Sequence, residues 1–173
     1  TGNVTLGMLS AWSNAGNSDI TFRGGLTQNG FSLSSGSGVY TFDTNAQAVG
    51  GTFGFTISNV TVTGITLTNN STAGFTAGST LAGTGTLLQG SGAILGIGGT
   101  ATIATLTATT SPNTVNYSGG AQTVLALTYH HLTLSGSGTK TMPGSTLTVN
   151  GDFTTSGTCT ATTSYGCTAR AGP

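Results

Sequence analysis

The sequence predicts an all-β fold, and within that class it favours a β-solenoid, a right-handed parallel β-helix, over a β-sandwich. Three observations support this: a composition dominated by Thr and Gly, short runs in which apolar and polar residues alternate, and internal repeats. Thr, Val, Ile and aromatic residues favour strands because their side chains pack well on a pleated surface. Gly and Asn supply the positive φ angles that tight turns require.

The composition is unusual for its lack of charge. The 173 residues include 38 Thr, 30 Gly, 18 Ser and 11 Asn, but only three Lys or Arg and three Asp, with no Glu. Between Asp43 and Lys140 the chain runs 96 residues without a charged side chain. Disorder is typical of low hydrophobicity with high net charge, whereas here net charge is zero and 35% of residues are hydrophobic. We therefore expect a core, in a single domain over residues 1–173.

The expected elements are short strands along the whole chain. At the N-terminal end, Met8–Trp12 is expected to form a short helical or irregular cap. Alternation then marks Thr61–Thr63, Leu132–Leu134 and Leu147–Val149 as strands, each followed by Gly, Ser or Asn. Period-two alternation over short runs bounded by turn residues is typical of strands. No segment shows a convincing helical period.

Internal similarity divides the chain into a partial unit at about 1–39 and units at about 40–112 and 113–173. Segment 42–49 aligns with 117–124, segment 58–64 with 130–136, and segment 78–81 with 144–147. A weaker alignment places three further apolar residues at one position. The aligned residues expected to point inward are Val60 with Leu132, Val62 with Leu134, and Leu26 with Leu87 and Phe153.

These repeats favour the solenoid, in which coils of about 20 residues stack on one another. The length allows about eight coils at the usual strand spacing of ~4.8 Å. Equivalent residues would form ladders along the axis, and ladders of Thr, Ser and Asn stack without charge repulsion. A sandwich remains the alternative because it also places a turn signal every 8–12 residues.

The stretches Asn113–Val124, Tyr129–Thr141 and Gly144–Gly151 resemble the repeats of large bacterial cell-surface and secreted proteins. These include filamentous-haemagglutinin-like and autotransporter-type adhesins. The resemblance implies a right-handed β-helical stalk, export and display at the cell surface. It covers about residues 113–157, with a weaker echo in 40–90, and carries no catalytic signature.

The sequence offers little for catalysis, and we expect no enzyme, no cofactor and no metal site. A glycosidase needs two carboxyl groups across the scissile bond, but Asp19, Asp43 and Asp152 fall at unrelated repeat positions. Adjacent side chains on a strand point to opposite faces, so His130 and His131 are expected to be structural rather than to chelate a metal. The Gly83–Gly85 and Gly96–Gly99 segments lack the Lys and Ser/Thr of a phosphate-binding loop.

Cys159 and Cys167 close a short polar loop near the C-terminus. Two cysteines in such a loop indicate a disulfide and an oxidising compartment, while a pair of buried free thiols is the alternative. Five asparagines fit the Asn-X-Ser/Thr pattern of N-glycosylation, but so many matches are expected by chance in a Ser- and Thr-rich chain. These are Asn3, Asn59, Asn69, Asn70 and Asn116.

Charge and hydropathy restrict the partners. Three basic residues cannot neutralise a useful number of phosphates, so nucleic acid is not expected, and no apolar run is long enough for a transmembrane helix. Zero net charge removes self-repulsion. The expected function is therefore an extracellular or cell-surface structural subunit that assembles with copies of itself into a filament, tube or surface layer. A stalk segment of an adhesin is the alternative, with ice-binding or glycan-binding modules less favoured.

Overall fold

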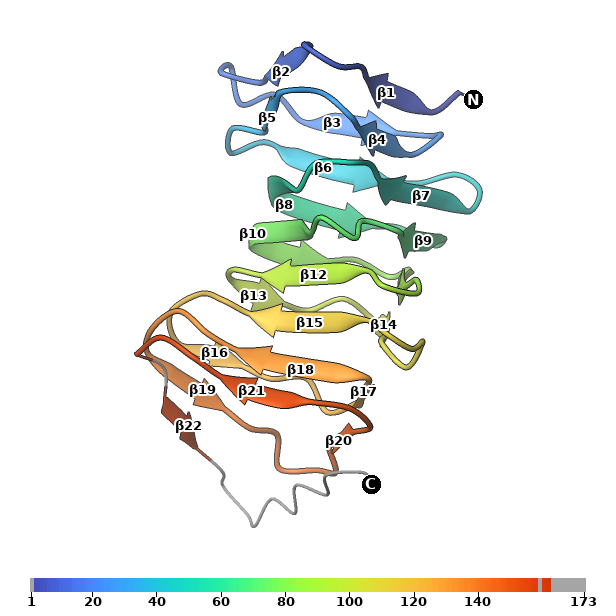
Figure 1. Ribbon diagram of the computed structural model, residues 1–173. Coiled ribbons are helices and arrows are strands. Elements are labelled where there is room, and N and C mark those ends of the chain that lie inside the picture. Colours follow the sequence, from blue (N-terminus) through green and yellow to red (C-terminus); the bar gives the residue numbers. More distant parts are fainter. Residues whose placement is uncertain (1, 159, 163–173) are drawn as a thin grey trace.

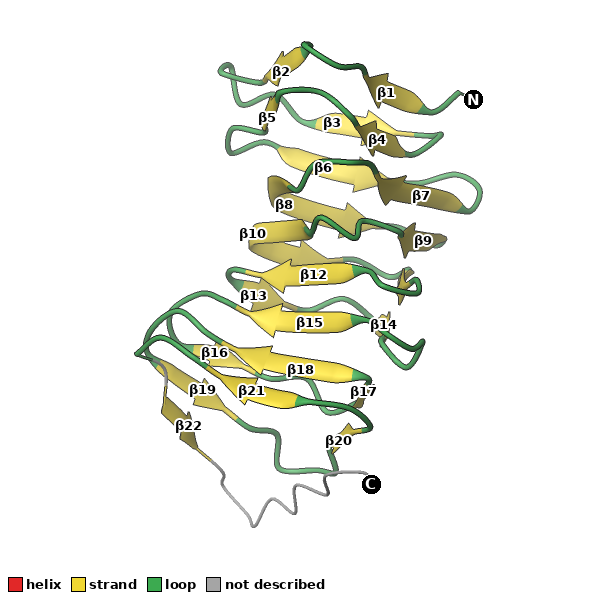
Figure 2. Cartoon of the chain, in the orientation of Figure 1, coloured by secondary structure: helices red, strands yellow, loops and turns green. Residues whose placement is uncertain are grey.

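The chain forms a solenoid of stacked coils in a computed structural model that describes residues 2–158 and 160–162 (Figure 1). The described residues contain 22 strands and no helix (Figure 2). Every strand pair among them is parallel. The prediction of an all-β fold is confirmed, and so is the favoured β-solenoid; the alternative β-sandwich is excluded.

The strands form three faces, which we call A, B and C. Face A begins as a six-stranded sheet of β1 (Val4–Leu6), β4 (Leu26–Gln28), β7 (Gln47–Gly50), β9 (Thr66–Asn69), β11 (Thr86–Gln89) and β14 (Thr105–Thr107). A single bridge between Ala108 and Tyr129 connects this sheet to β17 and β20. These two strands complete face A and span Thr128–Tyr129 and Thr148–Val149.

Face B comprises β3 (Ile20–Phe22), β6 (Val39–Phe42), the second halves of β8 (Phe55–Val62) and β10 (Phe75–Ala82), and β13 (Thr100–Ala101). It ends in a three-stranded sheet of β16 (Gln122–Thr123), β19 (Thr139–Thr141) and β22 (Thr160–Thr162). Face C comprises β2 (Ala11–Ser13), β5 (Ser32–Ser34), the first halves of β8 and β10, then β12 (Ile94–Ile97), β15 (Thr114–Tyr117), β18 (His131–Leu134) and β21 (Phe153–Thr155).

Each coil passes through the faces in the order C, B and A, and about eight coils stack along the axis, as the length predicts. β8 and β10 are long because each turns the corner from face C to face B without interruption, and their pairing shifts register at that corner. The corners are named C–B, B–A and A–C after the faces they join, and apart from these two they consist of loops and turns (Figure 2).

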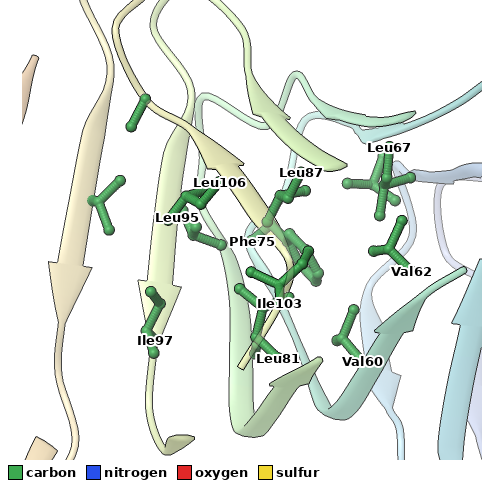
Figure 3. Close-up of a cluster of buried hydrophobic side chains, with 14 of the residues drawn as sticks. Val60, Val62, Leu67, Phe75, Leu81, Leu87, Leu95, Ile97, Ile103 and Leu106 are labelled. Atoms are coloured by element: carbon green, nitrogen blue, oxygen red, sulfur yellow. The ribbon is translucent and has the colours of Figure 1, made fainter. Parts of the chain in front are cut away.

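Inward-facing apolar side chains stack in columns and form one core (Figure 3). On face C, parallel pairing places five fully or nearly fully buried residues in register: Phe55, Phe75, Leu95, Val115 and Leu132. The Phe55 and Phe75 rings stack with centroids 5.1 Å apart. Burial of apolar side chains of this size contributes ~1.5–3 kcal/mol each, so the columns are the main source of cohesion between coils.

Six of the seven residues expected to point inward are buried: Val60, Val62, Leu132, Leu134, Leu26 and Leu87. The seventh expectation is wrong, because Phe153 is 43% exposed. Phe153 is in register with buried Leu132, but β21 is the last strand of its sheet among the described residues. One side of the Phe153 ring therefore has no neighbouring strand to cover it among the described residues.

The aligned residues do not share a face, although they share a local environment. Val60 lies on face B and Leu132 on face C. The aligned glutamines Gln47 and Gln122 show why the segments look alike: the Nε2 group of Gln47 donates to Phe22 O at 2.9 Å, and that of Gln122 to Ile97 O at 2.8 Å. Each glutamine thus ties its corner to the preceding coil. The similarity marks a corner motif that recurs at different corners.

Two expectations at the chain ends need comment. Met8–Trp12 is not helical: Met8 and Leu9 form a turn, and Ala11 begins strand β2. Cys159 and Cys167 lie outside the described residues, so the disulfide stays a prediction.

Candidate functional surfaces

Threonine ladders cover the outer surfaces of the faces. On face B, Thr21, Thr41 and Thr61 are in register on three successive coils. At the other end of the same face, Thr139 pairs with Thr160 and Thr141 with Thr162, and all four are exposed. Strand alternation explains the arrangement, because the residues between the threonines point inward. The outer surface is therefore rich in methyl and hydroxyl groups and poor in charge.

The ladders are interrupted on every face. Ala82 follows Thr61 on face B, Leu88 lies between Thr68 and Thr107 on face A, and Gly96 follows Thr76 on face C. Among the residues that the structure describes, no face carries an unbroken threonine array of the kind that would order water as an ice-binding surface.

A shallow groove runs over face C, with a volume of about 650 Å³. Residues from five successive coils line it, from Phe31 beside β5 to Ser118 beyond β15. Its floor includes Gly54, Gly74 and Gly96, which leave the sheet surface low. No charged residue lines it.

Large apolar side chains are exposed beside this groove, at the A–C corner of the first coils. Met8, Leu9, Phe31 and Phe53 are 83%, 92%, 82% and 51% exposed. They lie between β1 and β2, between β4 and β5, and between β7 and β8, so they occupy the same corner on successive coils. Sequence reasoning missed this cluster because the residues are far apart in the chain and only the coil register aligns them.

The three aspartates lie at three different corners. Asp19 is at the C–B corner, Asp43 at the B–A corner and Asp152 at the A–C corner. They fix the turns of the solenoid: Asp19 Oδ1 accepts from Val39 N of the next coil at 2.8 Å, and Asp43 Oδ1 accepts from Arg23 Nε at 3.2 Å. These two bonds connect neighbouring coils. The arrangement brings no two carboxyl groups together.

The histidines are closer than strand alternation predicts. Their ring centroids are 4.2 Å apart and nearly perpendicular, because His130 belongs to the corner and only His131 belongs to β18. The premise that they face opposite sides is therefore wrong. His131 Nδ1 accepts from Asp152 N at 2.9 Å, so that nitrogen carries no proton in this arrangement. Within the described residues, no cluster of three His, Cys, Asp or Glu side chains is placed to bind a metal.

Lys140 lies in the interior, fully buried on the inner side of β19. Its Nζ donates to the carbonyl oxygens of Gly119 at 2.6 Å, Gly120 at 2.5 Å and Ser137 at 3.1 Å. The sequence carries a signal for this placement: Lys140 is flanked by Thr139 and Thr141, which are the outward residues of an alternating strand.

A second buried polar cluster joins faces C and A. The hydroxyls of Tyr117 and Tyr129 are 2.9 Å apart, and Leu125 N donates to Tyr117 Oη at 3.0 Å. Burial raises the pKa of Tyr117, and burial together with the neighbouring Tyr117 raises the pKa of Tyr129. Both groups therefore stay neutral and structural.

The glycine-rich segments serve the corners. Gly83 has a φ of +114°, and a Cβ there would lie 2.1 Å from Val62 O of the preceding coil. Only glycine allows two backbones to approach this closely. Backbone packing therefore accounts for the glycine-rich segment, and a phosphate-binding role is not needed to explain it.

The glycosylation patterns fall in different environments. Asn69 is fully buried and its Nδ2 donates to Gln89 Oε1 at 2.9 Å, so the folded chain offers no room for a sugar there. Asn3 and Asn70 are exposed, while Asn59 and Asn116 are half-buried.

Comparison with protein-family models, with curated proteins and with solved structures found no match to this chain. The described part of the chain has no helix suited to crossing a membrane. What the structure itself defines is a β-solenoid with uncharged faces and a groove. The resemblance to adhesin-type repeats stays an expectation.

Proposed function

We propose that the protein is an extracellular or cell-surface structural subunit, and that copies of it assemble into a filament, tube or surface layer. The observation that carries the proposal is the set of parallel ladders that run along all three faces and end in strands paired on one side only. Among the described residues, β1 and β2 have no partner beyond the first coil, and β21 and β22 have none beyond the last. Unpaired strand edges are templates for pairing with another chain.

Electrostatics supports assembly. The net charge of the chain is zero, so copies do not repel one another and can associate without a partner of opposite charge. Arg23 and Asp43 form an ion pair at the surface. Contacts between copies would consist of backbone pairing, small-residue packing and hydroxyl bonds, with few salt bridges.

A stalk segment of a cell-surface adhesin is the second candidate. Eight coils spaced by ~4.8 Å give a rod of about 35 Å. Such a rod holds whatever is joined to it at a fixed distance. In this case, pairing at the solenoid edges would be to further coils of one chain rather than to another copy.

We propose no catalytic role, because the three aspartates support three separate corners. Catalysis would require polysaccharide cleavage by the pure protein that Asp43→Ala or Asp152→Ala abolishes. A hydrolytic product formed under that test would remove this part of the proposal.

Electron microscopy and sedimentation of the purified chain test the assembly. We expect concentration-dependent polymers whose interfaces each bury well over ~1,000 Å², the scale of specific association. They should persist in 1 M salt because there is little charge to screen. A stable monomer at high concentration, at all salt concentrations, would rule out the polymer and leave the stalk.

A further inference from the structure

We propose that the groove on face C binds a neutral, extended glycan chain that lies along the solenoid axis. This site is separate from the strand edges that the assembly proposal uses. Four properties of the groove lead to it: its length, its glycine floor, its apolar wall and its uncharged polar rim.

The length of the groove fits a linear polymer. Its lining begins at Phe31 in the second coil and ends at Ser118 in the sixth. Four intervals of ~4.8 Å give about 19 Å along the axis. A single small molecule would occupy a part of this length, whereas an extended chain contacts every coil.

The floor allows a ring to approach the sheet closely. Gly96 occupies an outward position of β12, in register with Thr76 and Asn116, and Gly54 and Gly74 lie immediately before β8 and β10. The low floor at Gly96 is required by packing, because a Cβ there would lie 2.4 Å from Thr76 Oγ1. The neighbouring threonine therefore leans over the glycine and forms a side of the groove.

The groove has an apolar wall for the carbon-bound hydrogens of a sugar. Phe31 is 82% exposed and Ile94 is 39% exposed, and both line the groove. An exposed aromatic ring presents a negative π face, which attracts the weakly positive C–H groups on one side of a pyranose. Phe31 is thus available for stacking without any rearrangement of the core.

The rim provides hydrogen-bonding groups without charge. Thr56, Thr76 and Ser118 carry hydroxyls and Asn116 an amide, each able to donate and to accept. Asn116 Oδ1 accepts from Ser135 Oγ at 2.8 Å, which holds the amide in one orientation. Sugar hydroxyls likewise both donate and accept, so this set matches a glycan.

The absence of charge and the direction of the groove select among extended polymers. No charged side chain lines the groove, so an acidic polysaccharide or nucleic acid would gain no ion pair. An extended peptide binds most readily by adding a strand to a sheet edge. Of the strands under the groove, β10, β12 and β15 are paired on both sides, while the face C half of β8 pairs with β10 alone. A peptide added at that one edge would lie across the solenoid axis, whereas the groove runs along it.

Affinity electrophoresis of the full chain in native gels tests the site. The probes are two linear neutral polysaccharides, hydroxyethyl cellulose and dextran, with alginate as the acidic control. We expect retardation by at least one neutral polymer, and Phe31→Ala should weaken that binding about tenfold by removing the aromatic contact. Phe53→Ala is the matched control, because Phe53 is exposed at the same corner but does not line the groove.

The outcomes are separable from assembly, which is measured in gels without polysaccharide. Retardation by a neutral polymer that Phe31→Ala reduces and Phe53→Ala preserves supports the site. The proposal is overturned if neither neutral polymer retards the protein, if only alginate does, or if the two phenylalanine variants behave alike. Mobility that changes with protein concentration alone would indicate that the groove is covered by a second copy, and would also overturn the glycan assignment.

Discussion

At the scale of single residues, the interior of this solenoid depends on polar groups that join one coil to the next. Gln47 and Gln122 bind backbone carbonyls of the preceding coil, and Lys140 binds three carbonyls around its ammonium group. Because buried carbonyls without donors are costly, these side chains stabilise the corners where the regular ladders stop. Apolar columns hold the faces together, and polar side chains hold the corners.

Lys140→Met tests the corner role of the buried ammonium. Methionine fills a similar volume but donates nothing, so the carbonyls of Gly119, Gly120 and Ser137 lose a donor. We expect the free energy of unfolding to fall by about 1–3 kcal/mol in urea titrations. The outward neighbour provides the control: Thr139→Ala should change stability by less than about 0.5 kcal/mol. Equal effects in both variants would contradict this role.

The tyrosine pair predicts a decline of stability at alkaline pH. The folded-state pKa values of Tyr117 and Tyr129 are raised above the ordinary value of 10.0. The folded chain therefore keeps protons that the unfolded chain releases above pH 10. Stability from these groups is fully present below pH 10 and is lost progressively as the pH rises beyond it.

Urea unfolding at pH 8, 10 and 11 measures this decline, and Tyr129→Phe should make it smaller because one titrating group is removed. Ultraviolet titration provides an independent check, since the phenolate absorbs at longer wavelength. Ionisation of all tyrosines near pH 10 in protein that is still folded would show that the pair is not protected.

At the scale of strands, most of what the sequence predicts is which residues face inward. The alternation in Leu132–Leu134 and Val60–Val62 places their side chains correctly, because strand geometry alone decides it. The face on which each strand lies was not predictable. The same apolar–Thr–apolar pattern occurs on all three faces, and corner lengths vary from coil to coil, so counting residues loses the register.

The candidate site was harder to predict than the fold. The groove consists of residues from five coils, and no segment of the sequence contains more than a few of them. Phe31 alone is an ordinary loop phenylalanine. Phe31 forms part of the groove wall only because the stacking of coils places Gly54, Gly74 and Ile94 along the same groove. The exposure of Phe153 also escaped prediction, because alternation does not show that β21 ends its sheet.

The uncharged ladders predict a penalty for repeated charge. Thr41 and Thr61 are register partners on adjacent strands of face B. In the double variant Thr41→Asp/Thr61→Asp, two carboxylates would lie about 5 Å apart and repel by about 1 kcal/mol in water. We expect the double variant to be less stable than the sum of the single variants at low salt, with the excess much reduced in 1 M salt.

The double variant Thr41→Asn/Thr61→Asn provides the control, because asparagine has the same shape as aspartate but amides stack without charge repulsion. Its effects should be additive and independent of salt. If the aspartate pair were additive as well, repulsion would not be the reason for the 96-residue stretch without charge.

At the scale of the whole molecule, the fold is a one-dimensional stack in which each coil contacts only its neighbours. Thr66 and Thr86 are register partners one coil apart. Deleting residues 66–85 removes one complete coil and brings β8 next to β12 and β13. We expect the shortened chain to fold, with a urea m-value lower by roughly one eighth because less surface is exposed on unfolding.

Deleting only residues 66–75 is the matched control. It removes β9 and the first residue of β10, so the coil loses its face A strand and the chain passes from face B directly into face C, and the core columns cannot form in register. Circular dichroism should show strand structure in the full-coil deletion and its loss in the half-coil deletion. Equal damage in both would mean that the coils are not interchangeable units.

The direction of the hydrogen bonds has a mechanical consequence. Because all paired strands cross the axis, the bonds between them point along it, on faces A, B and C together. A pull on the two ends of the rod therefore loads the same bonds that hold coil to coil, and every junction carries the full tension in series. Such a rod yields at its weakest junction while the rest stays wound, so it would lengthen in steps of one coil rather than break at once.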